Sequence, residues 1–168
     1  MIKHVVELTV QNATAQQFYD FMINPTSACY RAWWPGEHLD FYIVKRGKKS
    51  HLGDVVFMDE YLGSKSRRLT GYAVVAKAKR PNIIIWQMKK ARLRLPIFVG
   101  LFLKDVPDGV AVKHELRIGY RGLGMVFDPL IKLCFNKPYR RALEAHCRAE
   151  WPMLAQYLTK VGLLCEAC

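Results

Sequence analysis

Two residues near the C-terminal end of the chain could bind a metal ion together. His146 and Glu150 are separated by one helical turn in the sequence, so on an α-helix their side chains reach toward the same point. At about 100° per residue, Glu150 projects between Leu143 and Leu154, near the middle of the apolar side of this helix. A carboxylate that faces a core is costly unless a partner compensates its charge. The pair therefore predicts a metal site, or a buried contact of Glu150 with His146 or with an arginine.

Two further candidate ligands lie in the first half of the sequence. His38 ends an aromatic segment, residues 33–38, that contains two tryptophans. Glu60 alternates with Val56 and Met58 in a strand-like segment, so it stands among apolar side chains. The opposite side of that segment is also apolar, and the pattern therefore leaves open which side faces the core.

His114 is a third polar residue in an apolar setting. Alternation places it with Val112, Leu116 and Ile118, while the residues between them are charged. We therefore expect His114 to point into the interior. Imidazole titrates near neutral pH, which makes His114 our candidate for a general acid or base; a structural histidine of the core is the simpler alternative.

The secondary-structure elements that must position these residues follow a clear order. A strand over 5–10 is followed by a helix that Asn12 or Thr14 can cap, and a long amphipathic helix is predicted over about 138–160. Between these helices, turn residues separate a series of predicted strands: 41–45, 54–62, 68–77, 82–89, 96–103 and 110–120. Such spacing is typical of consecutive hairpins and predicts an antiparallel sheet.

These elements predict an α+β fold with one domain over residues 1–160. A strongly twisted antiparallel sheet can curl around the long helix and enclose an internal cavity between them. Residues 161–168 are expected to be a C-terminal tail. Its Cys165 and Cys168 form a lone CxxC, which lacks the second pair that a zinc ribbon needs.

Composition narrows the classes of function. The chain has 168 residues, five cysteines and a formal net charge of +12. An odd number of cysteines does not favour a disulfide framework, and no apolar run has the ~20 residues of a membrane span, so we expect a cytoplasmic protein. The basic residues occur in short clusters near predicted turns, without a nucleic-acid-binding motif. We expect no nucleic-acid partner, although charge alone also allows a basic domain that associates with RNA or a membrane.

The order of elements resembles the START-like, polyketide-cyclase (helix-grip) superfamily. Within it, three segments resemble the diacetylphloroglucinol hydrolase family: YRAWWPGEH at 30–38, EYLG at 60–63 and HCRAE at 146–150. In that family a histidine after a Trp–x–Pro-type segment, a strand glutamate and the HxxxE pair bind zinc, and a further strand histidine lies near the metal. The resemblance implies that the metal ligands are His38, Glu60, His146 and Glu150, with His114 beside them.

Two functions follow from this interpretation. The first is a hydrolase, dependent on zinc or another divalent transition metal, that cleaves a carbon–carbon bond in a small aromatic ketone or polyketide-like substrate. Its hydroxyl donors could be any of several tyrosines: Tyr42, Tyr61, Tyr72 and Tyr120. The second is a non-catalytic protein that binds a small apolar ligand, with a structural metal or none. For either function we expect a small aromatic or apolar molecule in the cavity, and a homodimer is compatible with the sequence.

Overall fold

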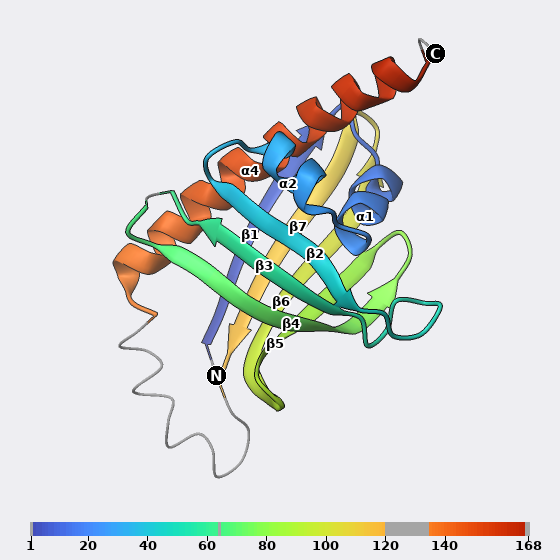
Figure 1. Ribbon diagram of the computed structural model, residues 1–168. Helices are drawn as coiled ribbons and strands as arrows, with labels where there is room; N and C mark the ends of the chain where they lie inside the picture. The colour runs from blue at the N-terminus through green and yellow to red at the C-terminus, as the bar shows by residue number, and fades with distance from the viewer. Residues whose placement is uncertain (1, 64, 120–134, 167–168) are drawn as a thin grey trace.

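A long helix lies across one face of a curved antiparallel sheet (Figure 1). The structure is a computed structural model that describes all residues except 1, 64, 120–134 and 167–168. The elements are β1 (Ile2–Gln11), α1 (Ala15–Ile23), α2 (Ser27–Trp33), β2 (His38–Lys45), β3 (Val55–Tyr61), β4 (Arg68–Lys79), β5 (Ile83–Lys90), β6 (Leu93–Val106), β7 (Gly109–Ile118) and α4 (Lys137–Glu166). The predicted α+β helix-grip fold is confirmed.

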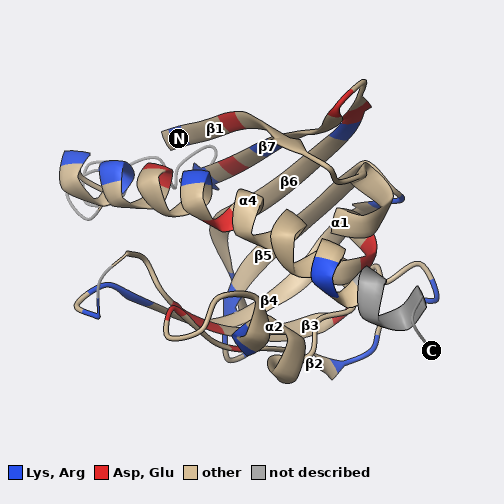
Figure 2. Cartoon of the chain, turned by 90° about the horizontal axis from the view of Figure 1, so that it is seen from above, with Lys and Arg blue, Asp and Glu red and all other residues tan. Residues whose placement is uncertain are grey.

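The sheet has seven strands in the order β1-β7-β6-β5-β4-β3-β2, and every neighbouring pair is antiparallel. Strands β2 to β7 follow one another as hairpins, whereas β1 joins the far edge beside β7. Register shifts at Val75/Lys77 and Gln87/Lys89 interrupt the regular pairing on both sides of β5. Such irregularities bend strands, and Figure 2 shows the sheet folded about β5 around the space beneath α4.

The concave face of the sheet and the inner side of α4 form the core. Val6 of β1 and Val56 of β3 are each 1% exposed, and Leu154 of α4 is fully buried. Their spacing follows the strand and helix periods on which the sequence prediction depended. Beside this core, the sheet and α4 enclose a cavity of about 340 Å³.

Local signals explain where the short helices begin and end. Thr14 caps α1 by accepting a hydrogen bond from the backbone N–H of Gln17, whose side chain accepts one from the Thr14 backbone N–H in return. Asn24 ends α1. The next helix, α2, begins after Thr26, whose hydroxyl oxygen accepts a hydrogen bond from the backbone N–H of Cys29. The sequence predicted only a short aromatic region there, because a helix of seven residues has too few turns to show a clear periodicity.

Several element boundaries differ from the prediction, and two of these differences concern residues singled out in the sequence. Strand β2 begins at His38 rather than at residue 41, so the candidate ligand His38 lies on the sheet itself. Helix α4 continues past Lys160 to Glu166, so it is longer than predicted and Cys165 belongs to it, whereas Cys168 lies outside the described residues. Among the helices that the structure describes, none combines the length and apolarity that crossing a bilayer requires.

Candidate metal centre

Helix α4 presents His146 and Glu150 toward the sheet, as the sequence predicted. Their side chains are buried, with residue exposures of 3% for His146 and 7% for Glu150. The imidazole of His146 stacks on the indole of Trp34, with ring centroids 4.8 Å apart. The indole N–H of Trp33 donates a hydrogen bond to the backbone carbonyl of Glu150 over 3.2 Å. The segment that ends α2 therefore holds this part of α4 in place.

The sheet presents the other two candidate ligands from neighbouring strands. His38 and Glu60 are direct partners in the β2–β3 register, so their side chains leave the same face of the sheet. Tyr30 of α2 contacts both of them: its ring stacks parallel on His38 at a centroid distance of 4.0 Å, and its hydroxyl donates a hydrogen bond to Glu60 Oε2. This tyrosine therefore orients two of the four candidate ligands.

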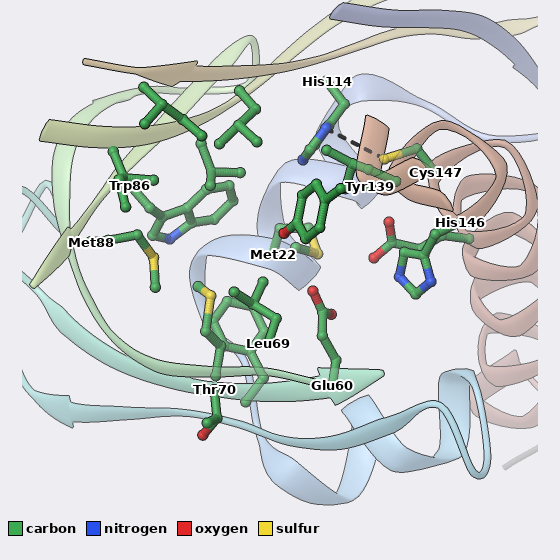
Figure 3. A pocket seen from close by; sticks show the side chains of 18 of the residues that line it. Met22, Glu60, Leu69, Thr70, Trp86, Met88, His114, Tyr139, His146 and Cys147 are labelled. Carbon is green, nitrogen blue, oxygen red and sulfur yellow. Dashed lines mark hydrogen bonds between the residues drawn. The ribbon is translucent and has the colours of Figure 1, made fainter. Parts of the chain in front are cut away.

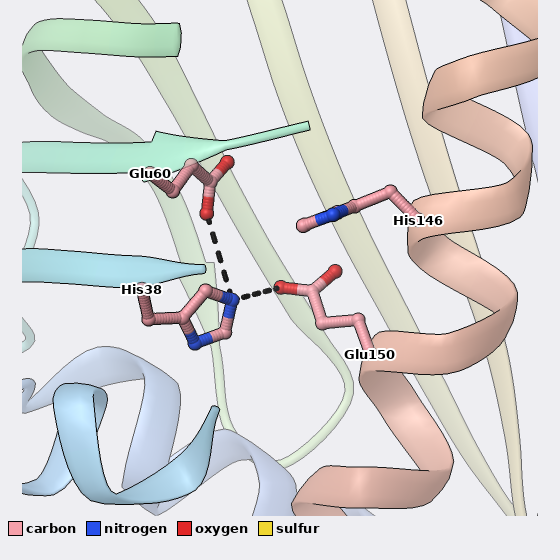
Figure 4. Close-up of side chains that lie close together, drawn as sticks. All are labelled: His38, Glu60, His146 and Glu150. Carbon is pink, nitrogen blue, oxygen red and sulfur yellow. Dashed lines mark ion pairs between the residues drawn. The ribbon is translucent and has the colours of Figure 1, made fainter. Parts of the chain in front are cut away.

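The four side chains converge on one place (Figure 4). Each of His38, Glu60, His146 and Glu150 offers a ligand atom, and these atoms all lie within 4.8 Å of one another. His38 Nε2 is 3.8 Å from Glu60 Oε2 and 3.6 Å from Glu150 Oε1. The prediction that His38, Glu60 and the helix pair His146 and Glu150 converge on one point in the interior is therefore supported by the geometry of the side chains.

Burial favours the uncharged forms of all four groups. Burial lowers the pKa of His38 to about 3, with a smaller effect of His146, and lowers the pKa of His146 to about 4. Both imidazoles are therefore neutral near pH 7. Burial also raises the pKa of Glu60 to about 7, against the hydrogen bond from Tyr30, and burial and the charge of Glu60 together raise the pKa of Glu150.

The cluster fits a divalent cation. Within the described part of the chain, both ring nitrogens of His38 and both of His146 are buried without a hydrogen-bond partner, although buried polar atoms are usually paired. Neutral imidazoles and carboxylates are the nitrogen and oxygen ligands of zinc and similar metals. Atoms bound ~2.0–2.2 Å from a tetrahedral zinc ion are ~3.4 Å apart, close to the two separations measured from His38. The residues could thus hold a metal ion, whose identity the donor set leaves open.

His114 lies beside this cluster but outside it. Its side chain lines the cavity, as the alternation in β7 predicted, and its Nδ1 is 3.4 Å from the Cys147 sulfur (Figure 3). Burial lowers the pKa of His114 to about 4, with smaller effects of His146 and His4. His114 is therefore a neutral imidazole that faces the same space as Glu60 and His146.

Of the tyrosines that the sequence offered as hydroxyl donors, the three that the structure describes do not line the cavity. Tyr42 and Tyr72 are 40% and 43% exposed, Tyr61 lies under the guanidinium of Arg68, and Tyr120 is outside the described residues. The cavity is instead lined by two other tyrosines, Tyr30 and Tyr139. The sequence analysis missed Tyr30 as a partner of the ligands, although its place in the same short aromatic segment as His38 was a usable signal.

Comparisons with known proteins define the class of fold. No protein-family model and no curated protein sequence matches the chain. Solved structures do resemble it. Ara h 8.0201 has a TM-score of 0.63 and 8% identity over 95% of this chain and 98% of that chain. The protein TTHA0849 from Thermus thermophilus has a TM-score of 0.61 and 8% identity over 95% and 99% of the two chains.

A third similar structure is the di-domain ARO/CYC BexL from the BE-7585A biosynthetic pathway. It has a TM-score of 0.59 and 15% identity, and the match covers 94% of this chain and 50% of BexL. At such identities the likeness concerns the fold alone. The chain therefore has the fold of the helix-grip superfamily, whereas none of these matches supports the finer resemblance to diacetylphloroglucinol hydrolases.

Proposed function

We propose that the chain is a metal-dependent hydrolase, with zinc as the preferred ion, that acts on a small aromatic ketone or polyketide-like molecule held in the cavity. The observation that carries this proposal is the convergence of two buried imidazoles and two buried carboxylates at the wall of an apolar cavity, where the ring nitrogens have no hydrogen-bond partner among the described residues. A core has no need of four such groups in one place, since each of them costs free energy when it is buried without a compensating partner.

The roles of the four ligands follow from their positions. His38 and Glu60 come from adjacent strands and His146 and Glu150 from one helical turn, so the fold fixes both pairs independently. A bound ion would polarise the ketone carbonyl and could lower the pKa of a water molecule to ~7. Tyr30 would keep the Glu60 carboxylate and the His38 ring oriented through its hydrogen bond and its stacking contact.

His114 is the proposed acid/base residue. Hydrolysis of an acyl-aromatic bond sends the hydroxyl of water to the acyl carbon, which gives a carboxylic acid, and a proton to the ring carbon that leaves. Cys147 holds His114 through Nδ1, whereas Nε2 forms no hydrogen bond within the described residues and is open to a ligand. Because His114 is neutral, its Nε2 would first accept a proton from the attacking water and would then give that proton to the ring carbon as it leaves.

The cavity supplies binding and excludes water. Its volume of about 340 Å³ is near the lower end of the ~300–1,000 Å³ range of small-molecule pockets. Phe41, Trp86, Met88 and Leu116 are among the apolar residues that line it. Burial of an aromatic ring against these side chains is favourable. Figure 3 shows the polar side chains of Glu60 and His146 near each other at one side of the cavity.

A second candidate is a binding protein without catalysis, in which the metal joins helix and sheet. Four protein ligands are typical of structural zinc sites, whereas catalytic sites usually keep one position open. The candidate centre offers four. Catalysis would then require a fifth position at the metal, or displacement of one carboxylate.

One assay separates the two candidates. Acylated phenols are incubated with native protein, with metal-free protein and with His114→Asn, and the release of a carboxylic acid is measured. The hydrolase proposal predicts activity of the native protein only, since general acid–base groups typically contribute ~10²–10⁴-fold. Activity that survives both changes rules out the proposed mechanism. Tight binding of an acyl-phenol without release of acid favours the binding protein.

A further inference from the structure

The cavity reaches the surface at one end of the molecule. Most of the partly exposed lining residues lie where β3 and β7 end and where β4, β6 and α4 begin: Glu60, Leu69, Leu95, Ile97, Ile118 and Tyr139. Val99 and His114 are also partly exposed. Lining residues further along, such as Met22 and Phe41, are buried. A ligand would therefore enter between the β3–β4 turn, the β5–β6 hairpin and the first turns of α4.

Basic side chains surround this entrance on all three elements. Lys65 and Arg67 are exposed in the β3–β4 turn, and Lys137 and Arg141 are exposed in the first turns of α4; Figure 2 shows both groups at the same end of the molecule. The β5–β6 hairpin adds three exposed residues: Lys90, Arg92 and Arg94. None of these residues forms an ion pair with an acidic side chain in the described part of the chain. Their charges are thus available to an anionic surface.

The hairpin tip also carries an apolar side chain. Leu93 pairs with Lys90 across the turn and is 66% exposed, more than any other large hydrophobic residue of the described chain. The tip extends beyond the last β6–β7 pair, Ile97 with Ile118, and projects past the end of the neighbouring strands (Figure 1). An isolated exposed leucine needs no explanation, but this one stands between two arginines at the mouth of an apolar cavity.

We propose that this entrance docks on an anionic lipid bilayer. Lysine and arginine near such a surface are attracted to the lipid headgroups, and an apolar side chain beside them can enter the interface. Leu93 favours a bilayer over a nucleic acid, because a phosphate backbone offers a leucine no apolar phase. When the entrance is docked on the bilayer, an apolar molecule would pass directly from the membrane into the cavity. This function does not depend on the metal centre.

The β2–β3 loop provides a matched control, because it has the same kind of composition at a different place. Lys48 and Lys49 are exposed there and Leu52 is 37% exposed. This loop lies at the other end of the sheet, away from the entrance to the cavity (Figure 1). Adsorption driven by net charge alone would depend on both sites equally, whereas docking at the entrance depends on the hairpin.

The test is sedimentation of the full chain with vesicles of phosphatidylcholine alone or of phosphatidylcholine mixed with phosphatidylglycerol. We expect binding to the mixed vesicles only, and weaker binding at high salt. The paired change Arg92→Glu with Arg94→Glu should lower the partition coefficient about tenfold or more. Leu93→Ser should lower it about tenfold, and Lys48→Glu with Lys49→Glu should change it far less. Circular dichroism would verify that all three variants are folded.

Several results would overturn the proposal. They are the absence of binding to the mixed vesicles, an equal loss in the Lys48/Lys49 variant, and binding that Leu93→Ser leaves unchanged. The last result, together with equal binding to a soluble polyanion such as heparin, would assign the basic residues to an acidic macromolecule instead of a membrane.

Discussion

Replacement of Glu150 by glutamine separates the cost of burying this carboxylate from the benefit of a metal bound to it. Glutamine keeps the size and shape of the side chain and removes its charge. In metal-free protein, burial and the neighbouring Glu60 raise the pKa of Glu150, which means that the charged form destabilises the fold. Metal-free Glu150→Gln should therefore be at least as stable as metal-free native protein.

The order of stabilities should reverse when metal is added. An ion at about 1,000 times its dissociation constant stabilises the native state by ~4 kcal/mol. For a chain of 168 residues, ~1 kcal/mol changes Tm by about 2–4 °C, so native protein should gain about 8–16 °C. If loss of one carboxylate lowers the affinity for the metal about 100-fold, the metal stabilises the variant by only ~1.4 kcal/mol. The Tm of the variant should then rise by only about 3–6 °C.

The assay is thermal unfolding followed by circular dichroism, first with a chelator and then with excess zinc. Glu144→Gln is the control, because Glu144 is on the same helix but pairs with Arg148 at the surface over 3.0 Å. It should respond to zinc as native protein does. An equal zinc-dependent rise in Tm for Glu150→Gln and native protein would refute the assignment of Glu150 as a ligand.

Three other outcomes follow from the same site. Burial holds the pKa of His114 at about 4, below its ordinary 6.5. The stability that the neutral imidazole contributes to the fold is therefore complete above pH 6.5 and is lost as the pH falls toward 4. Over that range native protein should lose about 3 kcal/mol more than His114→Asn in urea titrations, and equal losses would contradict a buried neutral His114. Tyr30→Phe removes the hydrogen bond to Glu60 and should weaken zinc binding about tenfold in a chelator competition, whereas the exposed Tyr42→Phe should not; an unchanged affinity would show that Tyr30 does not orient the ligands. Val99→Phe narrows the cavity and should weaken binding of an apolar fluorescent probe without affecting zinc affinity, so unaltered probe binding would place the probe elsewhere.

The parts of the site that the sequence predicted depend on regular periodicity. His146 and Glu150 face the core because α4 continues without interruption through both residues, and His114 points inward because β7 keeps strict alternation. For Glu60 the sequence did not decide the orientation, because both faces of the strand were apolar. The pairing of β3 between β2 and β4 determines that the face with Glu60 points toward the core. His38 was a candidate because of its aromatic segment and its place in the family resemblance, and no periodicity predicted that β2 begins there.

The missed contacts depend on tertiary structure. The bond between His114 and Cys147 requires a particular curvature of the sheet under α4, and Cys147 looked like one apolar position among several on the helix. Tyr30 reaches Glu60 because the short helix α2 packs beside β2, and that helix was too short to predict. Spacing along the chain does not encode distances of this kind.

The most direct test of the candidate metal centre is metal analysis of the purified protein combined with an anomalous difference map from its crystals. Our interpretation predicts about one ion of zinc or a similar divalent metal per chain, with a single anomalous peak ~2.0–2.2 Å from ligand atoms of His38, Glu60, His146 and Glu150. Protein that remains metal-free after exposure to zinc, or an anomalous peak bound by other residues, would contradict it.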